Sequence, residues 1–304
     1  MRFLREAGID LDVFHFRGGV TRPDNYLRGW LRLRRALRET AYDLLDVQFG
    51  QSGLITLWPH SLPLVVTFRG TDLHGGAAPG EPAGMRTRLF ATLIRTISRR
   101  VAARADRVVL VADHLRAYLP PGVQADILPS GLDLDFFKPV PSARTRLDLP
   151  TEGRIVLFAG GRRPVKRPEL ARAAVDLLPP DLNARLLVLD DVSPDLMPAY
   201  LSAADVLLLT SRSEGSPNIV KEALACDTPV VATDVGDVRE RIGHVPGCAV
   251  CAIDTPGAIA EALVQVLCRT EPFSGRVHVL DLDEHILARR MIAIYEELLH
   301  DTSV

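Results

Sequence analysis

Short apolar runs alternate with helical patterns along most of the chain. The runs are rich in Val, Leu and Ile and are bounded by turn or charged residues, which is typical of buried parallel strands. Strands that alternate with helices favour an α/β protein built on parallel sheets. The predicted strands are Leu11–Phe16, Leu44–Gln48, Leu64–Phe68, Arg107–Val111, Ala125–Leu128, Ile155–Ala159, Arg185–Leu189, Val206–Leu209, Val230–Ala232 and Cys248–Ile253, and the last predicted helix is about Asp283–Leu299.

The predicted strands form two series, separated by a proline-rich stretch. Each series is long enough for a domain of ordinary size. The pattern therefore predicts two Rossmann-like, doubly wound domains that face each other across a cleft. The predicted limits are 1–138 for the amino-terminal domain, 139–153 for a linker, 154–283 for the carboxyl-terminal domain, and 284–304 for a final helix that is expected to pack back on the amino-terminal domain.

The composition is that of a globular protein, with 304 residues of which 47% are hydrophobic and 24% charged. The net charge of −2 argues against a nucleic-acid-binding protein when the chain is taken as a whole. No apolar run has the length of a membrane-spanning helix, and we expect no signal peptide. Cys248 and Cys251 form a lone C-x-x-C in an apolar stretch, which favours buried thiols over a zinc site. We therefore expect a cytoplasmic protein without a bound metal.

Positive charge is concentrated in the first half of the chain. Residues 1–135 contain 18 Arg and no Lys against 14 acidic residues, whereas the remainder has 18 basic and 24 acidic residues. The arginines cluster in Tyr26–Arg38 and Arg86–Arg107, with apolar residues at roughly helical spacing. Such helices suit the surface of an anionic membrane, although a solvated face is the commoner explanation for either helix alone. Peripheral contact with the inner membrane face is thus one of two open interpretations.

The most informative segment is Ser213–Cys226, which holds two carboxylates, Glu214 and Glu222, eight positions apart. A glutamate pair at this spacing is common on solvated helices. Here, however, the segment lies between two predicted strands, so it falls at the carboxyl edge of a sheet, where open α/β sheets bind ligands. We interpret it as a nucleotide-sugar site, with Glu222 accepting hydrogen bonds from sugar hydroxyls and Glu214 facing the mouth.

The same segment contains a helix start. Pro217 preceded by Ser216 predicts a helix in which the proline occupies the first position. The first N–H groups would then point out of the helix end, where they suit a phosphate. These are the groups of Asn218, Ile219 and Val220.

Cations follow the first strand of the second series. Arg163 and Lys166 come after Ile155–Ala159, and the chain has only three lysines, of which Lys166 and Lys221 fall within motif segments. When the bond between the sugar and the phosphate of a nucleotide sugar breaks, negative charge develops on the phosphate group that leaves. Cations or dipoles must stabilise this charge when no metal does so. Beside the glutamate segment, we interpret Arg163 and Lys166 as phosphate ligands.

The chain resembles glycosyltransferase family 4, whose members have the two-Rossmann GT-B fold. The resemblance covers nearly the whole chain and implies transfer of a hexosyl or N-acetylhexosaminyl group from a UDP- or GDP-sugar, with retention at the anomeric carbon and with neither metal nor cofactor. It also implies that the amino-terminal domain faces the acceptor. The matching segments are Ile127–Asp133, Arg163–Arg167, Tyr200–Asp205 and Glu214–Gly236.

The resemblance also assigns roles to individual residues. It places Glu222 on the ribose hydroxyls, and Glu214 on the hydroxyls of the donor sugar. Arg163 and Lys166 would act on the diphosphate, with Arg162 as the alternative to Arg163. Gly215, Ser216, Asn218 and Ile219 would supply backbone contacts, and the stretch that ends at Val192 would border the base.

Two features depart from the family pattern. Arg69 stands where many relatives have a histidine that contacts the donor sugar, and Arg69 and Asp72 are expected to face the cleft. In addition, the chain opens at Phe3–Asp10, which resembles the end of the helix that normally follows the first strand. The first strand and its glycine loop are therefore expected to be missing, either because the start is truncated or because the domain is incomplete.

Two classes of function follow. The first is a retaining glycosyltransferase, and the second is a nucleotide-sugar-binding protein, or a truncated form, without turnover. A nucleotide-sugar epimerase is less favoured, and no Gly-x-Gly-x-x-Gly of a dehydrogenase follows a strand. The acceptor stays open between a lipid, a glycan and a small molecule.

Overall fold

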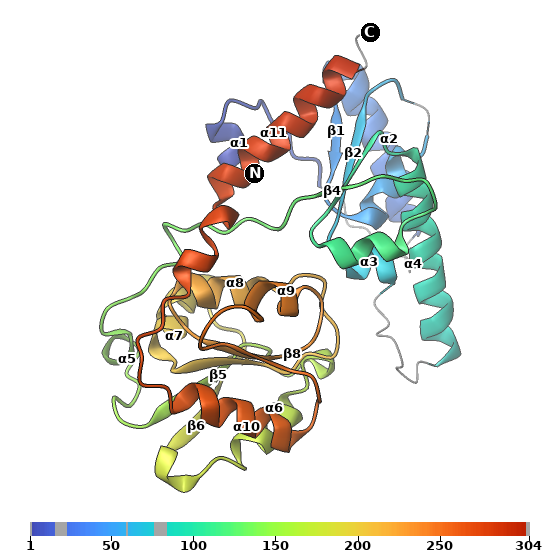
Figure 1. The fold of residues 1–304 in the computed structure, drawn as a ribbon. Coiled ribbons are helices and arrows are strands. Elements are labelled where there is room, and N and C mark those ends of the chain that lie inside the picture. Colours follow the sequence, from blue (N-terminus) through green and yellow to red (C-terminus); the bar gives the residue numbers. More distant parts are fainter. Residues whose placement is uncertain (1, 16–22, 59, 76–83, 302–304) are drawn as a thin grey trace. The chain divides into compact units, whose positions relative to one another are not determined.

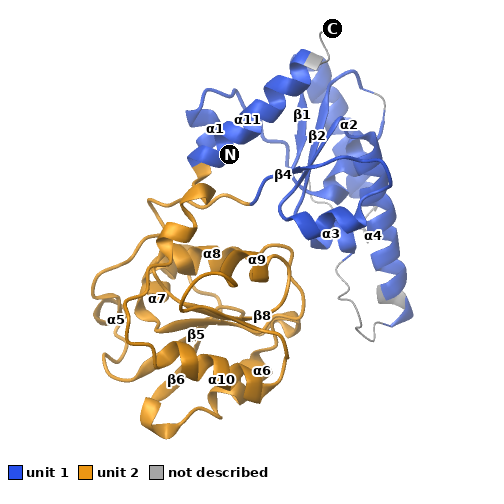
Figure 2. Ribbon diagram, viewed as in Figure 1, with its two compact units in different colours: residues 1–129, 285–304 blue, residues 130–284 orange. Residues whose placement is uncertain are grey.

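The structure, a computed structural model, describes residues 2–15, 23–58, 60–75 and 84–301. The chain divides into two compact units, of which unit 1 comprises residues 1–129 and 285–304, and unit 2 comprises residues 130–284 (Figure 2). Each unit has its own all-parallel sheet (Figure 1). The predicted α/β class is therefore confirmed.

Unit 2 carries five parallel strands: β5 (Arg154–Phe158), β6 (Ala184–Val188), β7 (Val206–Leu209), β8 (Val230–Thr233) and β9 (Ala249–Cys251). Their order across the sheet is β6-β5-β7-β8-β9. From β5 the chain first moves outward to β6, then returns past β5 to β7 and continues outward on the other side. The order therefore reverses between β5 and β7, which makes this position the topological switch point of the sheet.

Helices cover both faces of the unit 2 sheet. In Figure 1, α6 (Pro168–Val175) and α10 (Pro256–Leu267) lie on one face, while α7 (Met197–Ala203), α8 (Asn218–Ala225) and α9 (Val238–Ile242) lie on the other. Because both faces are covered, β5, β7 and β8 are nearly continuous apolar runs with buried side chains. The remaining elements of the unit are α5 (Ala143–Arg146), η3 (Pro164–Lys166), η4 (Pro180–Leu182), η5 (Pro194–Leu196), η6 (Arg276–His278) and η7 (Leu280–Leu282).

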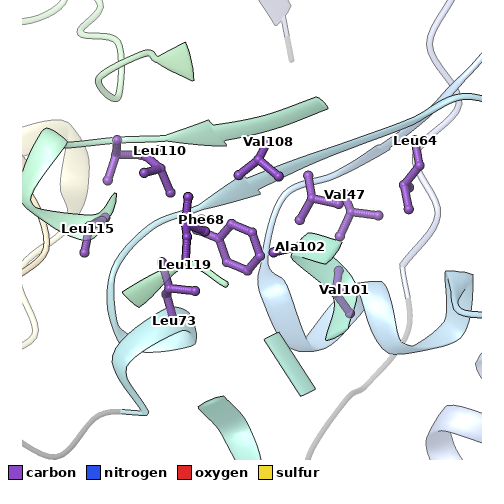
Figure 3. Packing of buried hydrophobic residues seen from close by; sticks show 12 residues of the cluster. Val47, Leu64, Phe68, Leu73, Val101, Ala102, Val108, Leu110, Leu115 and Leu119 are labelled. Atoms are coloured by element: carbon purple, nitrogen blue, oxygen red, sulfur yellow. The ribbon is translucent and has the colours of Figure 1, made fainter. Parts of the chain in front are cut away.

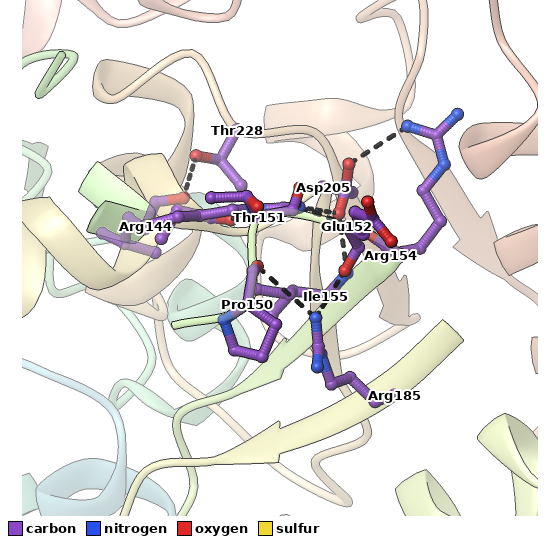
Figure 4. Close-up of polar contacts among 12 residues, drawn as sticks. Arg144, Pro150, Thr151, Glu152, Arg154, Ile155, Arg185, Asp205 and Thr228 are labelled. Atoms are coloured by element: carbon purple, nitrogen blue, oxygen red, sulfur yellow. Dashed lines mark hydrogen bonds and ion pairs between the residues drawn. The ribbon is translucent and has the colours of Figure 1, made fainter. Parts of the chain in front are cut away.

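Asp205 links the amino ends of β5 and β7, the two strands at the switch point (Figure 4). Its carboxylate accepts a hydrogen bond from the backbone N–H of Ile155 at 2.6 Å and from the guanidinium groups of Arg144 and Arg154. Arg144 also donates to the carbonyl oxygen of Thr151 at 3.0 Å. The entry into β5 is thus fixed to the start of β7, which sets the relative position of these two strands.

The described residues of unit 1 form four parallel strands in the order β1-β2-β3-β4, namely β1 (Leu45–Val47), β2 (Leu64–Phe68), β3 (Arg107–Leu110) and β4 (Asp126–Ile127). Every side chain of β2 is buried. Figure 3 shows the core beside it, where Phe68, Leu73, Val101 and Leu110 gather. The other elements are α1 (Arg2–Glu6), α2 (Pro23–Glu39), η1 (Gly50–Thr56), α3 (Thr71–His74), α4 (Met85–Arg104), η2 (Asp113–Tyr118) and α11 (Glu284–Asp301).

Helix α11 is anchored to unit 1 by polar contacts. Tyr295 donates a hydrogen bond from its hydroxyl to Asp46 Oδ2 at 2.7 Å, and Glu297 pairs with Arg107 at 3.2 Å. Burial raises the pKa of the Asp46 carboxyl. No helix among the described residues combines the length and the hydropathy that crossing a membrane requires.

Nine of the ten predicted strands are present, with ends that shift by up to two residues. The prediction for Leu11–Phe16 is wrong over residues 11–15, which form no strand, while residue 16 lies outside the described residues. Side chains hold this segment instead of a sheet partner, since Arg5 donates to the Leu11 carbonyl and Tyr42 to the Asp12 carboxylate. A short apolar run in the sequence could not reveal that no neighbouring strand pairs with this segment.

Candidate functional site

Two loops meet at the carboxyl edge of the unit 2 sheet. One follows β5 and spans residues 159–167, and the other follows β7 and spans residues 210–217. Since β5 and β7 flank the switch point, both loops leave the sheet at the place where open parallel sheets bind ligands. The backbone N–H of Arg212 donates to the Val165 carbonyl at 2.9 Å and joins the two loops directly.

Lys166 and Glu214 form an ion pair between these loops. The Lys166 ammonium donates to Glu214 Oε1, and the Ser211 hydroxyl donates to the same oxygen at 2.6 Å. The two side chains are only 12% and 15% exposed. The structure therefore brings together a cation and a carboxylate that the sequence places 48 residues apart, in surroundings where solvent screens their charges weakly.

Arg167 fixes the spacing of the loops. Its guanidinium donates to the carbonyl oxygens of Thr210 at 2.6 Å and Ser211 at 3.0 Å, and it pairs with Asp254 at 2.7 Å. The Thr210 hydroxyl donates in return to the Lys166 carbonyl at 2.8 Å. Arg167 itself has a φ of 53°, a left-handed conformation that only a few per cent of non-glycine residues adopt. These contacts hold the backbone on both sides of the Lys166–Glu214 pair.

Sequence reasoning missed Arg167, Thr210 and Ser211. One signal was available, because Thr210 and Ser211 are polar residues that directly follow a buried apolar strand. The partner of Arg167 was not visible in the sequence, since the three residues that it contacts are 43 to 87 positions away.

The loop after β7 leads into α8 in a different way from the one predicted. The helix begins at Asn218, so Pro217 is the residue before the first helical position. Ser216 does not cap the helix, because its hydroxyl donates to Asp237 Oδ2 at 2.7 Å. The N–H of Val220 donates to the Pro217 carbonyl at 3.2 Å, so the prediction that it points freely out of the helix end is wrong.

Asn218 and Ile219 lie at the helix start beside this loop, with Asn218 exposed and Ile219 half-buried. Gly215 lies against Gly236, and a Cβ on Gly236 would stand 2.6 Å from the Gly215 carbonyl oxygen. Since Gly236 also has a φ of +59°, glycine is required there for two independent reasons. The close approach holds the backbone of Gly215 in place directly after Glu214.

Glu222 lies on α8, five residues into the helix, and is half-buried. Burial raises the pKa of its carboxyl to about 7, although the neighbouring Lys221 works in the opposite direction. Lys221 is 1% exposed, and its ammonium lies 3.4 Å from Asn218 Oδ1. Glu222 is therefore a carboxyl group in a poorly solvated position, and hydrogen-bond donors from a ligand would stabilise its charged form.

A hollow of about 460 Å³ opens between the loops that follow β5 and β6. Its size is within the usual range for small-molecule sites. Three of the predicted donor residues, Arg162, Arg163 and Val192, line it together with Asp190. Arg162 pairs with Asp190 at 3.1 Å, and Arg163 Nε donates to the Gly160 carbonyl at 3.4 Å.

Arg69 and Asp72 belong to unit 1, so we describe them separately from the unit 2 loops. Asp72 is fully buried, and its carboxylate accepts hydrogen bonds from the backbone N–H groups of Gly50 at 2.9 Å, Arg69 at 3.0 Å and Gly70 at 2.8 Å. Arg69 is exposed, and its guanidinium donates to Gln48 Oε1 at 2.8 Å. Asp72, in α3, thus fixes the backbone that follows β2 and the start of η1, whereas Arg69 lies at the carboxyl edge of β2.

The described residues of the site offer neither a reactive thiol nor a cluster of metal ligands. The described residues contain no group of three or more His, Cys, Asp or Glu side chains arranged to hold a metal ion. Cys248 accepts a hydrogen bond from the Val230 N–H at 3.3 Å, and burial raises the pKa of both Cys248 and Cys251 to about 11. Both cysteines therefore have the character of inert thiols.

Two parallel-sheet units with a polar site at a switch point define a two-Rossmann protein of the GT-B class. Solved structures of this class match nearly the whole chain. Sucrose-phosphate synthase from Thermosynechococcus elongatus matches with a TM-score of 0.80 at 20% identity, covering 96% of this chain and 83% of that one. Anabaena HepE in complex with UDP-glucose matches with a TM-score of 0.74 at 16% identity, covering 97% and 88%.

Sequence comparisons give the family. The family model Glycosyltransferase Family 4 matches residues 2–136, and Glycosyl transferases group 1 matches residues 136–269. The D-inositol 3-phosphate glycosyltransferase of Saccharomonospora viridis is 30% identical over 296 residues, which cover 81% of this chain and 67% of that protein. The protein of the same name from Kineococcus radiotolerans is 31% identical over 270 residues, covering 71% and 60%. The chain belongs to glycosyltransferase family 4, and it spans about six tenths of the length of the latter relative.

Proposed function

We propose that the protein is a retaining glycosyltransferase that uses a UDP- or GDP-sugar as donor and transfers a hexosyl or N-acetylhexosaminyl group. The observation that supports this most strongly is the Lys166–Glu214 pair at the switch point of unit 2. It offers a cation for a diphosphate and a carboxylate for sugar hydroxyls from two loops that Arg167 holds together.

In this proposal the bond between the anomeric carbon and the diphosphate oxygen breaks, and the electron pair stays with the diphosphate. Lys166 and Arg163 stabilise the charge that develops there, so the transfer needs no metal and no cofactor. Arg162 is the alternative to Arg163. The acceptor hydroxyl forms the new bond on the face that the diphosphate leaves, and its proton passes to the departing phosphate oxygen.

The donor is held by residues on either side of the reacting bond. Glu222 accepts hydrogen bonds from the ribose hydroxyls, and Glu214 accepts them from the transferred sugar. The backbone of Gly215, Ser216, Asn218 and Ile219 borders the sugar and the phosphate, and the hollow at Val192 takes the base. Of the two unit 1 candidates, exposed Arg69 is the better donor ligand, because the oxygens of Asp72 are engaged by its own loop.

The acceptor is a hydroxyl compound whose class we leave to experiment. The relatives named above act, by their names, on D-inositol 3-phosphate. A phosphorylated polyol is therefore one arm of an acceptor panel, and a glycan and a lipid are the others. We further propose a cytoplasmic location with peripheral membrane contact.

The test of this function is a thermal-shift panel of UDP-, GDP-, ADP- and dTDP-sugars on the wild-type protein, followed by an assay of sugar release and transfer. A ligand that binds only the folded state raises the melting temperature. We expect one UDP- or GDP-sugar to raise it, and Glu222→Ala to weaken that donor by about 1–3 kcal/mol because ribose hydroxyls lose their acceptor. Unchanged donor affinity in that variant would remove Glu222 from the site.

A second function is binding of the nucleotide sugar without turnover. Arg69 supports it, because an arginine held by Gln48 is a poor proton shuttle where many relatives have a histidine. Donor binding with neither hydrolysis nor transfer, across the full acceptor panel, would favour this alternative over the enzyme.

A further inference from the structure

Helix α4 has apolar side chains on two opposite sides. Its inner face packs into the core of unit 1 through residues that include Ala91, Ile94 and Val101. Among the described residues of the helix, Ala91 is the first that is buried. All described residues from Gly84 to Phe90 are exposed. The first turns of the helix therefore do not pack on the core, and the ribbon of α4 runs past the strands of unit 1 at this end (Figure 1).

The outer side of these turns carries large apolar residues. Met85, Leu89 and Leu93 follow one another at intervals of four positions, so they form one stripe along the helix. They are 74%, 64% and 45% exposed, and Phe90 beside them is 42% exposed. These apolar side chains do not contribute to the core of unit 1, because the opposite face of the same helix packs there.

The charge of α4 has a single sign. Its 20 residues include six arginines and no acidic residue. Among the described residues, none forms an ion pair with Arg88, Arg95, Arg99 or Arg100, all of which are exposed. Helix α2 differs in this respect, because its Arg28 and Arg35 pair with acidic residues of the same helix. Of the two basic helices, α4 thus has the larger uncompensated positive charge.

We infer that the outer face of α4, defined here by Met85, Arg88, Leu89, Leu93 and Arg99, is a docking surface for an anionic lipid membrane. A helix lies in the membrane interface when apolar side chains enter the acyl boundary and cationic ones meet anionic headgroups. The stripe supplies the first group and the flanking arginines the second. This inference names the surface for the membrane contact proposed above, and it does not depend on the identity of the donor.

A partner protein or a second copy of this chain would also cover apolar side chains. The charge favours the membrane over a second copy, because two copies of α4 would place arginines against arginines. Anionic polymers without an apolar layer would leave Met85, Leu89 and Leu93 exposed, so they match only half of the surface.

The experiment is co-sedimentation of the full chain with vesicles of phosphatidylcholine, with and without phosphatidylglycerol. We expect binding to the mixed vesicles only, and weaker binding at high salt because the charges are screened. Leu89→Ser with Leu93→Ser should lower the partition coefficient roughly tenfold or more. Arg88→Gln with Arg99→Gln should lower it roughly thirtyfold.

Leu177→Ser with Arg172→Gln is the matched control, because both side chains are exposed in unit 2 and neither belongs to the proposed surface. It should bind vesicles as the wild type does. All substituted side chains are exposed, so unchanged thermal melting verifies that each variant is folded. Failure of the wild type to bind mixed vesicles at low salt, or equal binding by all variants, would overturn the inference. So would a wild-type dimer in analytical ultracentrifugation that Leu89→Ser with Leu93→Ser converts to monomer.

Discussion

Asp72, in the short helix α3, and Glu214, in the loop after β7, are both carboxylates at the carboxyl edge of a parallel sheet, yet their surroundings differ. Asp72 is fully buried, and three backbone N–H groups of unit 1 donate to it. Glu214 is partly exposed, and its partners are the side chains of Lys166 and Ser211 from the two loops of the switch point. The same residue class at the same kind of edge is therefore stabilised in two different ways.

The difference lies in which groups satisfy the carboxylate. Backbone N–H groups cannot be released without unfolding the loop that carries them, so Asp72 stabilises structure. A lysine side chain can exchange its carboxylate partner for a phosphate, so the Lys166–Glu214 pair is available to a ligand. Position at the sheet edge predicted both residues as ligands, but their partners separate them.

The largest expected effect is that of Lys166→Ala on sugar transfer. Loss of a cation that stabilises the departing diphosphate should lower kcat by about 10²- to 10³-fold. The free energy of unfolding should fall by less than about 3 kcal/mol, because Glu214, which is 15% exposed, keeps the Ser211 hydroxyl as donor once its cation is removed. Transfer assays and chemical denaturation measure the two quantities. Lys138→Ala is the control, because Lys138 is exposed and lies outside the site. A stability loss as large as the catalytic loss would give Lys166 the structural role assigned to Asp72.

Asp72→Ala should show the opposite pattern. Removing the carboxylate leaves three backbone N–H groups without their acceptor, and the free energy of unfolding should fall by about 3 kcal/mol or more. Donor binding to unit 2 should persist below the melting temperature of the variant. Urea denaturation and donor titration test this, with exposed Asp113→Ala as the matched change. If donor affinity falls while stability is kept, Asp72 is a ligand after all.

The pH dependence of the free energy of unfolding tests whether the Glu222 carboxyl is poorly solvated. Burial raises the pKa of its carboxyl from 4.5 to about 7, so the folded protein holds the proton more tightly than the unfolded chain. This contribution to stability is fully present below about pH 4.5 and declines as the pH rises to about 7, by about 3 kcal/mol at most. Glu222→Gln should remove this decline, and Glu261→Gln on the surface should not. The same pH slope in the wild type and in Glu222→Gln would contradict the raised pKa.

The smallest of these effects concerns Arg167. Arg167→Met removes hydrogen bonds to Thr210, Ser211 and Asp254, which loosens the two loops without removing a ligand contact. We expect donor affinity to fall about tenfold, with stability lower by about 1–2 kcal/mol. Calorimetric titration of the donor measures the first effect. Arg172→Met, which changes an exposed arginine of α6, serves as control, and equal donor affinity in both variants would show that the loops keep their spacing without Arg167.

The sequence predicted much of this picture, for reasons that are local. The strands of unit 2 are continuous apolar runs because helices cover both faces of their sheet, and such runs are visible in one sequence. Lys166, Glu214 and Glu222 were predicted as site residues from two short local segments, and the structure brings Lys166 and Glu214 together, while the role of Glu222 stays a prediction. Arg167 was not found, because its partners are distant in the chain. The segment at residues 11–15 was misassigned because a strand also needs a neighbour, which no local pattern reveals.

The central claim is that the switch point of unit 2 is the donor site. The most direct measurement is a crystal structure of the wild-type protein with the nucleotide sugar that raises its melting temperature most. We predict the diphosphate within hydrogen-bond distance of Lys166 and of Arg163 or Arg162, the ribose hydroxyls on Glu222, and the sugar on Glu214. A nucleotide sugar bound elsewhere, with the Lys166–Glu214 pair intact and Glu222 uncontacted, would contradict the claim.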